Sequence, residues 1–184
     1  MGALPEVGPH IPVTNQLDLQ LMHDFGAEHI WLSPELSLIQ IEELGEMSPV
    51  PLGLTIMGAQ EMMVTEHCLL MSQGPCNQDC ENCARRKSPH YLKDRKGYEM
   101  PVITDCTGRS HLYNAVSLDV THAVPDLIKA GVSALMVDTT LMNVSEVSKM
   151  VACAVRARDI ALKGGNRVSK AEGATSGHLF RGVS

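Results

Sequence analysis

The chain has 184 residues, of which 44% are hydrophobic and 20% charged, and its formal net charge at pH 7 is −6. This composition supports a folded core and excludes a disordered chain. No apolar run reaches the roughly 20 residues that cross a bilayer, and the N-terminus lacks a signal-peptide pattern. The sequence therefore predicts a soluble, cytoplasmic protein with no membrane partner.

Short apolar runs alternate with helically spaced apolar residues in the first half of the chain. A helix that ends at Gly26 separates the first two runs. Ser33 as N-cap and Pro34 as first helical residue predict a second helix, which ends at Gly45. The third run is nearly all apolar, as is typical of parallel strands covered on both faces. The predicted strands are residues 10–13, 29–32 and 51–57.

The alternation stops at residues 66–96, which carry four Cys and little periodicity, and it resumes after them. A helix over residues 125–130 precedes the last strand, and the longest helix follows it, opened by a capping box at Asn143 and Glu146. Residues 164–184, rich in Gly, Ser and Lys, predict a flexible tail. The strands predicted in this half are residues 101–105, 111–118 and 133–137, with a turn at Thr107 and Gly108.

Strand–helix units spaced by about twenty residues predict a parallel α/β architecture, either a doubly wound sheet or part of a (β/α) barrel. The strands are too few for a complete eight-fold barrel, which typically takes ~250 residues. Residues 1–184 are thus predicted to form a single α/β domain with an inserted four-Cys loop. The predicted core consists of Val13, Leu17, Leu21, Ile30, Leu32, Ile39, Leu54, Ile56, Ile103, Leu135, Val137, Val147 and Val151.

The charges are divided between the two halves of the chain. Residues 1–84 contain no Lys or Arg, and all 15 basic residues follow them. Arg85, Arg86 and Lys87 open a basic stretch that is suited to an RNA backbone or a small anionic substrate. The alternative is a solvated loop that balances the acidic half. The net acidity disfavours tight nonspecific binding of nucleic acid.

The chain has six cysteines, and without an export signal they argue against a disulfide scaffold. Four of them share the irregular loop, where a Cys-x-x-Cys pair lets two thiolates meet one metal centre. Four soft thiolates suit zinc or an iron–sulfur cluster, and the spacing does not decide between the two. Cys106 and Cys153 lie on separate elements and are not predicted ligands. The predicted ligands are Cys68, Cys76, Cys80 and Cys83.

Two specific stretches occur together with shorter ones spread over nearly the whole chain. The specific ones are the Cys cluster that follows Glu66-His67 and the sequence Ser-Pro-Glu-Leu-Ser-Leu at residues 33–38. The shorter ones are residues 13–15, 105–109, 112–114 and 176–180. In this order they resemble peptidase family U32, the collagenase-like peptidases.

The resemblance implies a TIM-type (β/α) barrel whose four Cys hold an iron–sulfur cluster, of the [4Fe-4S] type, with zinc as the alternative. It also implies oxygen-independent hydroxylation of RNA bases or of a small aromatic quinone precursor, as in characterised relatives. Carried over to this sequence, Glu35, Asn15, Arg109 and Asn114 are candidate catalytic residues at strand ends, where barrel active sites lie. The competing interpretation of Glu35 is an acid placed at a helix dipole.

Members of the family usually have a substantial N-terminal barrel half, and few residues precede the first matching strand here. The resemblance therefore implies a partial barrel that belongs to a longer protein. Such a barrel would pair with the missing N-terminal half or self-associate through its exposed strand edges. Three functions stay open: an iron–sulfur enzyme or its cluster-bearing part, a peptidase of the kind in the family's name, and a non-catalytic module pinned by zinc.

Overall fold

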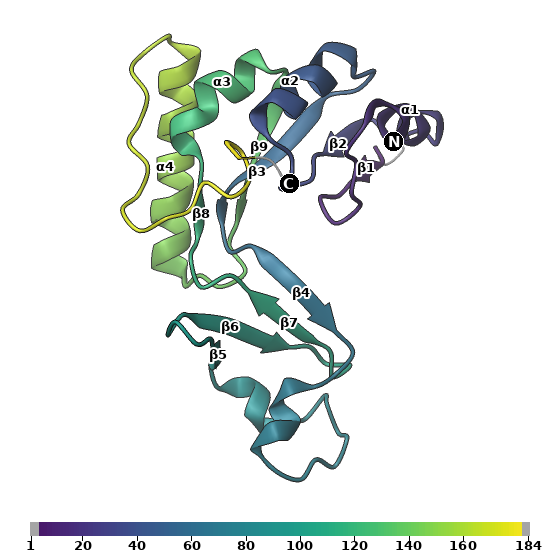
Figure 1. The fold of residues 1–184 in the computed structure, drawn as a ribbon, viewed down its shortest axis with the longest axis vertical. Helices are drawn as coiled ribbons and strands as arrows, with labels where there is room; N and C mark the ends of the chain where they lie inside the picture. The colour runs from purple at the N-terminus through teal and green to yellow at the C-terminus, as the bar shows by residue number, and fades with distance from the viewer. Residues whose placement is uncertain (1–3, 182–184) are drawn as a thin grey trace. The chain divides into compact units, whose positions relative to one another are not determined.

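The computed structural model describes residues 4–181 (Figure 1), and the contacts between residues divide the chain into two compact units. Unit 1 consists of residues 1–58 and 118–184, and unit 2 of residues 59–117. The segment predicted as an inserted loop thus lies within a unit that has its own sheet.

Unit 1 is built around β3 (Leu52–Gly58), the central strand of a mixed sheet. β3 pairs in parallel with β2 (His29–Trp31) and β9 (Val132–Asp138), and antiparallel with β8 (Leu118–Asp119). β1 (Glu6–Val7) continues the parallel order beyond β2. The predicted α/β class is confirmed for this unit. The described strands do not close into a barrel, so the partial barrel stays a prediction.

Helices connect the strands of unit 1, and α3 packs beside both α2 and α4 (Figure 1). The predicted capping box of the longest helix is confirmed, because the Asn143 side chain accepts the N–H of Glu146 and the Glu146 carboxylate accepts that of Asn143. No helix within residues 4–181 is long and apolar enough to cross a bilayer. The helices are α1 (Gln16–Asp24), α2 (Leu38–Met47), η3 (Thr121–Ala123), α3 (Val124–Lys129) and α4 (Val144–Leu162).

The predicted start of α2 at Ser33 is wrong. The N-cap is Ser37, whose hydroxyl accepts the N–H of Gln40 while the Gln40 side chain accepts that of Ser37. Ser33 is buried, and its hydroxyl accepts the N–H of Glu35 at 3.3 Å in the turn before the helix. Two serines offer the same capping chemistry, and the glutamine three residues after Ser37 decides between them.

The hydrophobic core of unit 1 contains the predicted strand residues Val13, Ile30, Leu32, Leu54 and Ile56, all buried. Leu135, Val137 and Val147 are half-buried. The core prediction is wrong for α1 and α2, because α1 buries Leu19 and α2 buries Ile41 and Leu44. The predicted apolar positions lie out of phase with those faces. The predicted core residues that are exposed are Leu17 (81%), Leu21 (47%), Ile39 (67%), Val151 (42%) and, in unit 2, Ile103 (37%).

Val151 is exposed because it lines an apolar groove of about 580 Å³ between β9, α3 and α4. Val155 and Leu162 lie on the same side of α4 and are also exposed. Beyond β9, the segment predicted as a tail makes contacts with unit 1. Arg167 forms a bidentate ion pair with Asp126, with N–O distances of 2.6 and 2.7 Å. Leu179, near the end of the segment, is buried.

Unit 2 contains an antiparallel sheet in the order β4-β7-β6-β5. The irregular Cys loop, with its two 3₁₀-helices, joins β4 to β5. The strand predicted over residues 111–118 is wrong as a single element, because it divides into β7 and β8, which belong to different sheets. The elements of unit 2 are β4 (Glu61–Thr65), η1 (Leu69–Gln73), η2 (Ala84–Lys87), β5 (His90–Lys93), β6 (Glu99–Thr104) and β7 (Ser110–Tyr113).

Candidate metal centre

The four clustered cysteines of unit 2 line one small cavity. Cys68 and Cys83 each precede a 3₁₀-helix, as the extended residue before η1 and before η2. Cys76 and Cys80 lie in the irregular stretch between these helices. Four positions of the loop therefore bring cysteine residues to the same cavity. The other residues that line this cavity are Leu70, Asp79, Arg86 and Thr104.

The thiols of this cavity influence one another electrostatically. Loss of solvent raises the pKa of the Cys80 thiol, and the charges of Cys76, Cys68 and Cys83 raise it further, while the Arg86 guanidinium acts in the opposite direction. Several thiolates are thus costly to hold here together unless a cation lies among them. As the side chains stand, no three His, Cys, Asp or Glu residues within positions 4–181 form a ready metal-binding group.

Arg85 stabilises the first half of the Cys loop from within. Its guanidinium donates to the carbonyl oxygens of Leu70 at 3.1 Å, Gly74 at 3.2 Å and Pro75 at 2.9 Å. The carbonyl oxygen of Arg85 itself lies 2.6 Å from His90 Nε2 on β5. This half-buried side chain therefore fixes the backbone turn that leads into Cys76.

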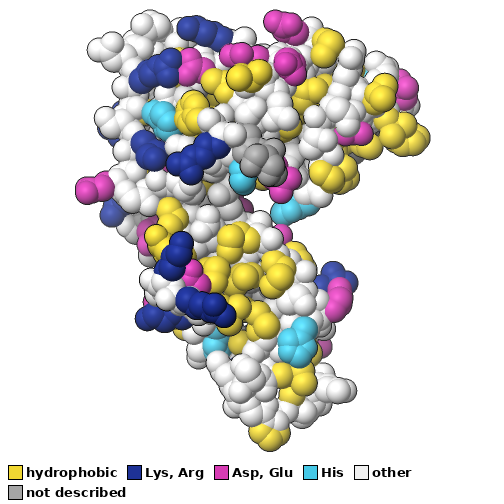
Figure 2. Space-filling view, in the orientation of Figure 1, with side chains coloured by type: hydrophobic (Ala, Val, Ile, Leu, Met, Phe, Trp, Pro, Cys, Tyr) yellow, Lys and Arg dark blue, Asp and Glu magenta, His cyan; other side chains and the backbone are white. Residues whose placement is uncertain are grey.

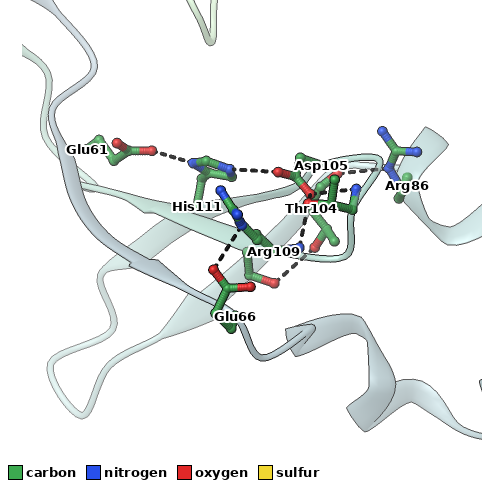
Figure 3. Close-up of polar contacts among 9 residues, drawn as sticks. Glu61, Glu66, Arg86, Thr104, Asp105, Arg109 and His111 are labelled. Carbon is green, nitrogen blue, oxygen red and sulfur yellow. Dashed lines mark hydrogen bonds and ion pairs between the residues drawn. The ribbon is translucent and has the colours of Figure 1, made fainter. Parts of the chain in front are cut away.

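Arg86 binds the second half of the loop in the same way. Its guanidinium donates to the carbonyl oxygens of Cys80 at 2.7 Å and Glu81 at 3.4 Å. It also donates to the carbonyl oxygen of Thr104 at 2.9 Å (Figure 3). Arg86 is half-buried, whereas Lys87 is exposed. The arginines predicted to contact RNA thus already bind backbone carbonyls, and an RNA contact at these three residues stays a prediction.

Sequence reasoning missed a chain of polar side chains on the sheet of unit 2 (Figure 3). Glu61 Oε1 on β4 lies 2.6 Å from His111 Nδ1 on β7, and His111 Nε2 lies 3.6 Å from Asp105 Oδ2. The Thr107 hydroxyl, followed by backbone N–H donors, lowers the pKa of Asp105 to about 2, so this carboxylate is charged at neutral pH. The resemblance at residues 105–109 was the available signal, but it did not single out His111.

The four predicted catalytic residues are divided between the units. Asn15 and Glu35 are exposed in the connections after β1 and β2 of unit 1, and Asn15 caps α1 by accepting the N–H of Asp18. In unit 2, Arg109 forms an ion pair with Glu66 at 2.9 Å. The side chain of Asn114, also in unit 2, accepts the N–H of Val116 at 3.2 Å. Catalytic roles for these residues stay predictions.

Comparison with models of protein families matches Peptidase family U32 over residues 7–179. The match covers the described strands and helices of both units except the first residue of β1. No curated protein and no solved structure matches the chain.

Proposed function

Because the chain belongs to peptidase family U32, we propose that its unit 2 holds the metal centre of an iron–sulfur enzyme. The proposed ligands are Cys68, Cys76, Cys80 and Cys83. The observation that carries the proposal is that these four thiols line one cavity from separate positions of a single loop. The chain would be this enzyme or its cluster-bearing part.

The donor set fits an iron–sulfur cluster because all four side chains are thiols, and the resemblance to the family implies the [4Fe-4S] type. The N–H of Gln78 donates a hydrogen bond to Cys76 Sγ at 3.3 Å, a contact that would serve a thiolate ligand of either a cluster or zinc. Gln78 has a φ of 62°, a left-handed conformation that a non-glycine residue rarely adopts. Hydrogen bonds to sulfur tune the reduction potential of a cluster. When bound, such a cluster would accept and donate electrons.

The proposed reaction is the oxygen-independent hydroxylation of an RNA base or of a small aromatic substrate. The β5–β6 hairpin supports such a substrate, because Tyr91 and Tyr98 are 56% and 53% exposed. The exposed Lys93, Arg95 and Lys96 belong to the same hairpin. Figure 2 shows Lys and Arg side chains beside hydrophobic ones on the surface of this unit. Aromatic rings stack on bases, and cations attract phosphate groups.

The apolar groove along β9 and α4 supports a further proposal about partners. Additional barrel residues or a second copy of the chain would cover Val151, Val155 and Leu162 there. Analytical ultracentrifugation of the chain and of its Val155→Asp variant tests the second copy. We expect concentration-dependent association that the substitution weakens. Monomers of both at every concentration would contradict the second copy.

Anaerobic purification followed by iron, sulfide and zinc analysis tests the metal centre. We expect bound iron and sulfide with visible thiolate-to-iron absorption, and loss of both when any one of the four ligands is changed to Ser. Cys153→Ser, a half-buried cysteine of α4 in unit 1, is the matched control and should keep the metal. Zinc without iron would support the zinc-pinned module instead. Full metal retention in all four ligand variants would refute the assignment.

Two measurements, of RNA binding and of peptide cleavage, separate the remaining functions. A single-stranded RNA probe should bind more weakly to the Tyr91→Ala/Tyr98→Ala variant than to the unchanged protein, and equal binding would contradict an RNA substrate at this hairpin. Peptide cleavage that persists when all four ligand cysteines are replaced by Ser would favour the peptidase function of the family's name over the iron–sulfur function.

A further inference from the structure

Two hairpin turns of unit 2 have the same construction. Asp94–Tyr98 joins β5 to β6, and Asp105–Arg109 joins β6 to β7. In each turn the N–H of the Asp donates to the carbonyl of the fifth residue, and the N–H of the Gly donates to the carbonyl of the Asp. In each, one carboxylate oxygen of the Asp accepts the N–H groups of the third and fifth residues. The glycines, Gly97 and Gly108, have φ values of 89° and 91°.

The surroundings of the two glycines differ. A Cβ atom added at Gly108 would lie 2.9 Å from Cys80 Sγ, which is shorter than a van der Waals contact between carbon and sulfur. A Cβ atom added at Gly97 would meet only Lys93 Cε, at 3.9 Å, the flexible end of an exposed side chain. Gly108 is buried and Gly97 is exposed. Both positions therefore have a positive φ that favours glycine, but only at Gly108 would a side chain collide with a thiol.

Hydrogen bonds connect both strands beside the Gly108 turn to the Cys loop. Arg86 joins the carbonyl of Thr104, the last residue of β6, to the carbonyl of Cys80. On the other strand, the buried Ser110 hydroxyl accepts the N–H of Leu69 at 2.9 Å, directly after Cys68. The position of the turn against Cys80 is thus fixed on both sides.

We propose that the Asp105–Arg109 turn is a positioning element of the four-Cys centre, with Gly108 as its positioning residue. The turn is the wall against which the Cys80 sulfur is placed, and glycine is required there because any side chain would push that sulfur away from the cavity. The inference rests on the proposed metal centre, because it assigns to Cys80 the role of a ligand.

A matched pair of substitutions tests this inference in the full chain. Gly108→Ala and Gly97→Ala impose the same backbone cost at a positive φ, so their difference isolates the contact with Cys80. Titration with Co²⁺ as a probe, followed by its thiolate charge-transfer absorption, measures affinity and the number of thiolate ligands independently of enzyme activity. We expect Gly108→Ala to lower the affinity by about tenfold or more, as for other groups that orient metal ligands, and to weaken the absorption. Gly97→Ala should leave both nearly unchanged.

A double substitution keeps the test decisive if Gly108→Ala alone fails to fold. Replacing Cys80 with Ala removes the sulfur that a new Cβ would meet. We therefore expect the Cys80→Ala/Gly108→Ala protein to fold and to bind Co²⁺ no more weakly than Cys80→Ala, so that the two effects are non-additive. Equal losses in Gly108→Ala and Gly97→Ala, or additive losses in the double variant, would overturn the positioning role. Absence of Co²⁺ binding to the unchanged protein would instead refute the metal centre.

Discussion

The two units of this chain are stabilised by different means. The cluster of buried residues that forms the hydrophobic core lies wholly in unit 1, between its sheet and its helices. In residues 59–117, all of which are described, the buried apolar residues are Ala59, Leu70, Val102, Leu112 and Tyr113. Several large apolar side chains of this unit lie instead at the surface (Figure 2), among them Met62, Met63 and Val64 on β4.

A unit with so small a core needs another source of stability. Domains below about 70–80 residues commonly gain it from disulfides or from a structural metal. The cysteines of unit 2 are free thiols in the structure, and four of them line one cavity. We therefore expect unit 1 to fold by burying apolar surface and unit 2 to depend on the proposed metal centre. Each prediction below tests one side of this difference.

The largest expected effect is the unfolding of unit 2 when metal is removed from the proposed centre. Structural thiolate sites bind zinc with apparent free energies of about 10–16 kcal/mol, which is as large as the whole free energy of unfolding of a typical domain, about 5–15 kcal/mol. After chelation, we expect amide hydrogens of β6 and β7, such as that of Leu112, to lose protection from exchange. Those of β3, such as that of Ile56, should keep it. Equal protection of Leu112 with and without metal would contradict the comparison.

A deletion in the core of unit 1 gives the next largest effect. Leu19 is fully buried on α1, and Leu17 on the same helix is 81% exposed. Leu19→Ala should lower the free energy of unfolding of unit 1 by about 2–5 kcal/mol, because it leaves a cavity. Leu17→Ala should change it by less than about 0.5 kcal/mol. Denaturant titration followed by the fluorescence of Trp31, the single Trp of the chain and part of β2, measures both.

Most helices and strands of unit 1 could be predicted because their signals are local. The strand predicted over residues 10–13 is wrong, because these residues form a turn and irregular backbone and β1 lies at Glu6–Val7. The apolar run at residues 51–57 became β3, and the capping box at Asn143 opens α4. The side of a helix that faces the core was harder to predict. Leu17 and Leu19 are equally apolar, and only the packing against the sheet decides which of them is buried. In unit 2, β4 pairs with β7 across a long stretch of chain, and its exposed methionines gave no periodic signal.

In the candidate site, too, the local features could be predicted and the contacts between distant parts of the chain could not. The clustering of the four cysteines is local, and it identified four of the residues that line the cavity. The roles of Arg85, Arg86 and Gly108 could not be predicted, because they consist of contacts with backbone carbonyls and with Cys80 that depend on the conformation of the loop. The polar chain through His111 could not be predicted either, because Glu61 lies on β4 and His111 on β7, two strands that are distant in sequence.

Loss of a loop-stabilising arginine should have a smaller effect than loss of the metal. The Arg86 guanidinium is half-buried and joins the carbonyls of Cys80 and Thr104. Arg86→Met should destabilise metal-loaded unit 2 by about 1.5–3 kcal/mol, the range for hydrogen bonds to charged groups. Lys87→Met, at the exposed neighbour, is the control and should be nearly neutral. Hydrogen exchange of β6 amides measures the difference, and equal protection in the two variants would show that Arg86 does not stabilise the loop.

The smallest effect is a pH dependence confined to unit 1. Burial lowers the pKa of His122, whose Nδ1 is buried without a hydrogen-bond partner in the described structure and whose ring contacts the Phe180 ring in a tilted arrangement. Because the folded-state pKa lies below that of the unfolded chain, the stabilisation is complete above the unfolded value of about 6.5. It decreases as the pH falls through the folded-state pKa.

We therefore expect the denaturant midpoint of unit 1, followed by Trp31 fluorescence, to fall as the solution is made more acidic than about pH 6.5, where the unfolded histidine begins to bind protons. His122→Phe keeps an aromatic ring against Phe180 and removes the titrating group, so it should flatten this dependence. His23→Gln, at an exposed position of α1, should leave the dependence unchanged. The same slope in all three proteins would show that another group causes it. A parallel loss of protection in unit 2 would show that the two units do not unfold independently.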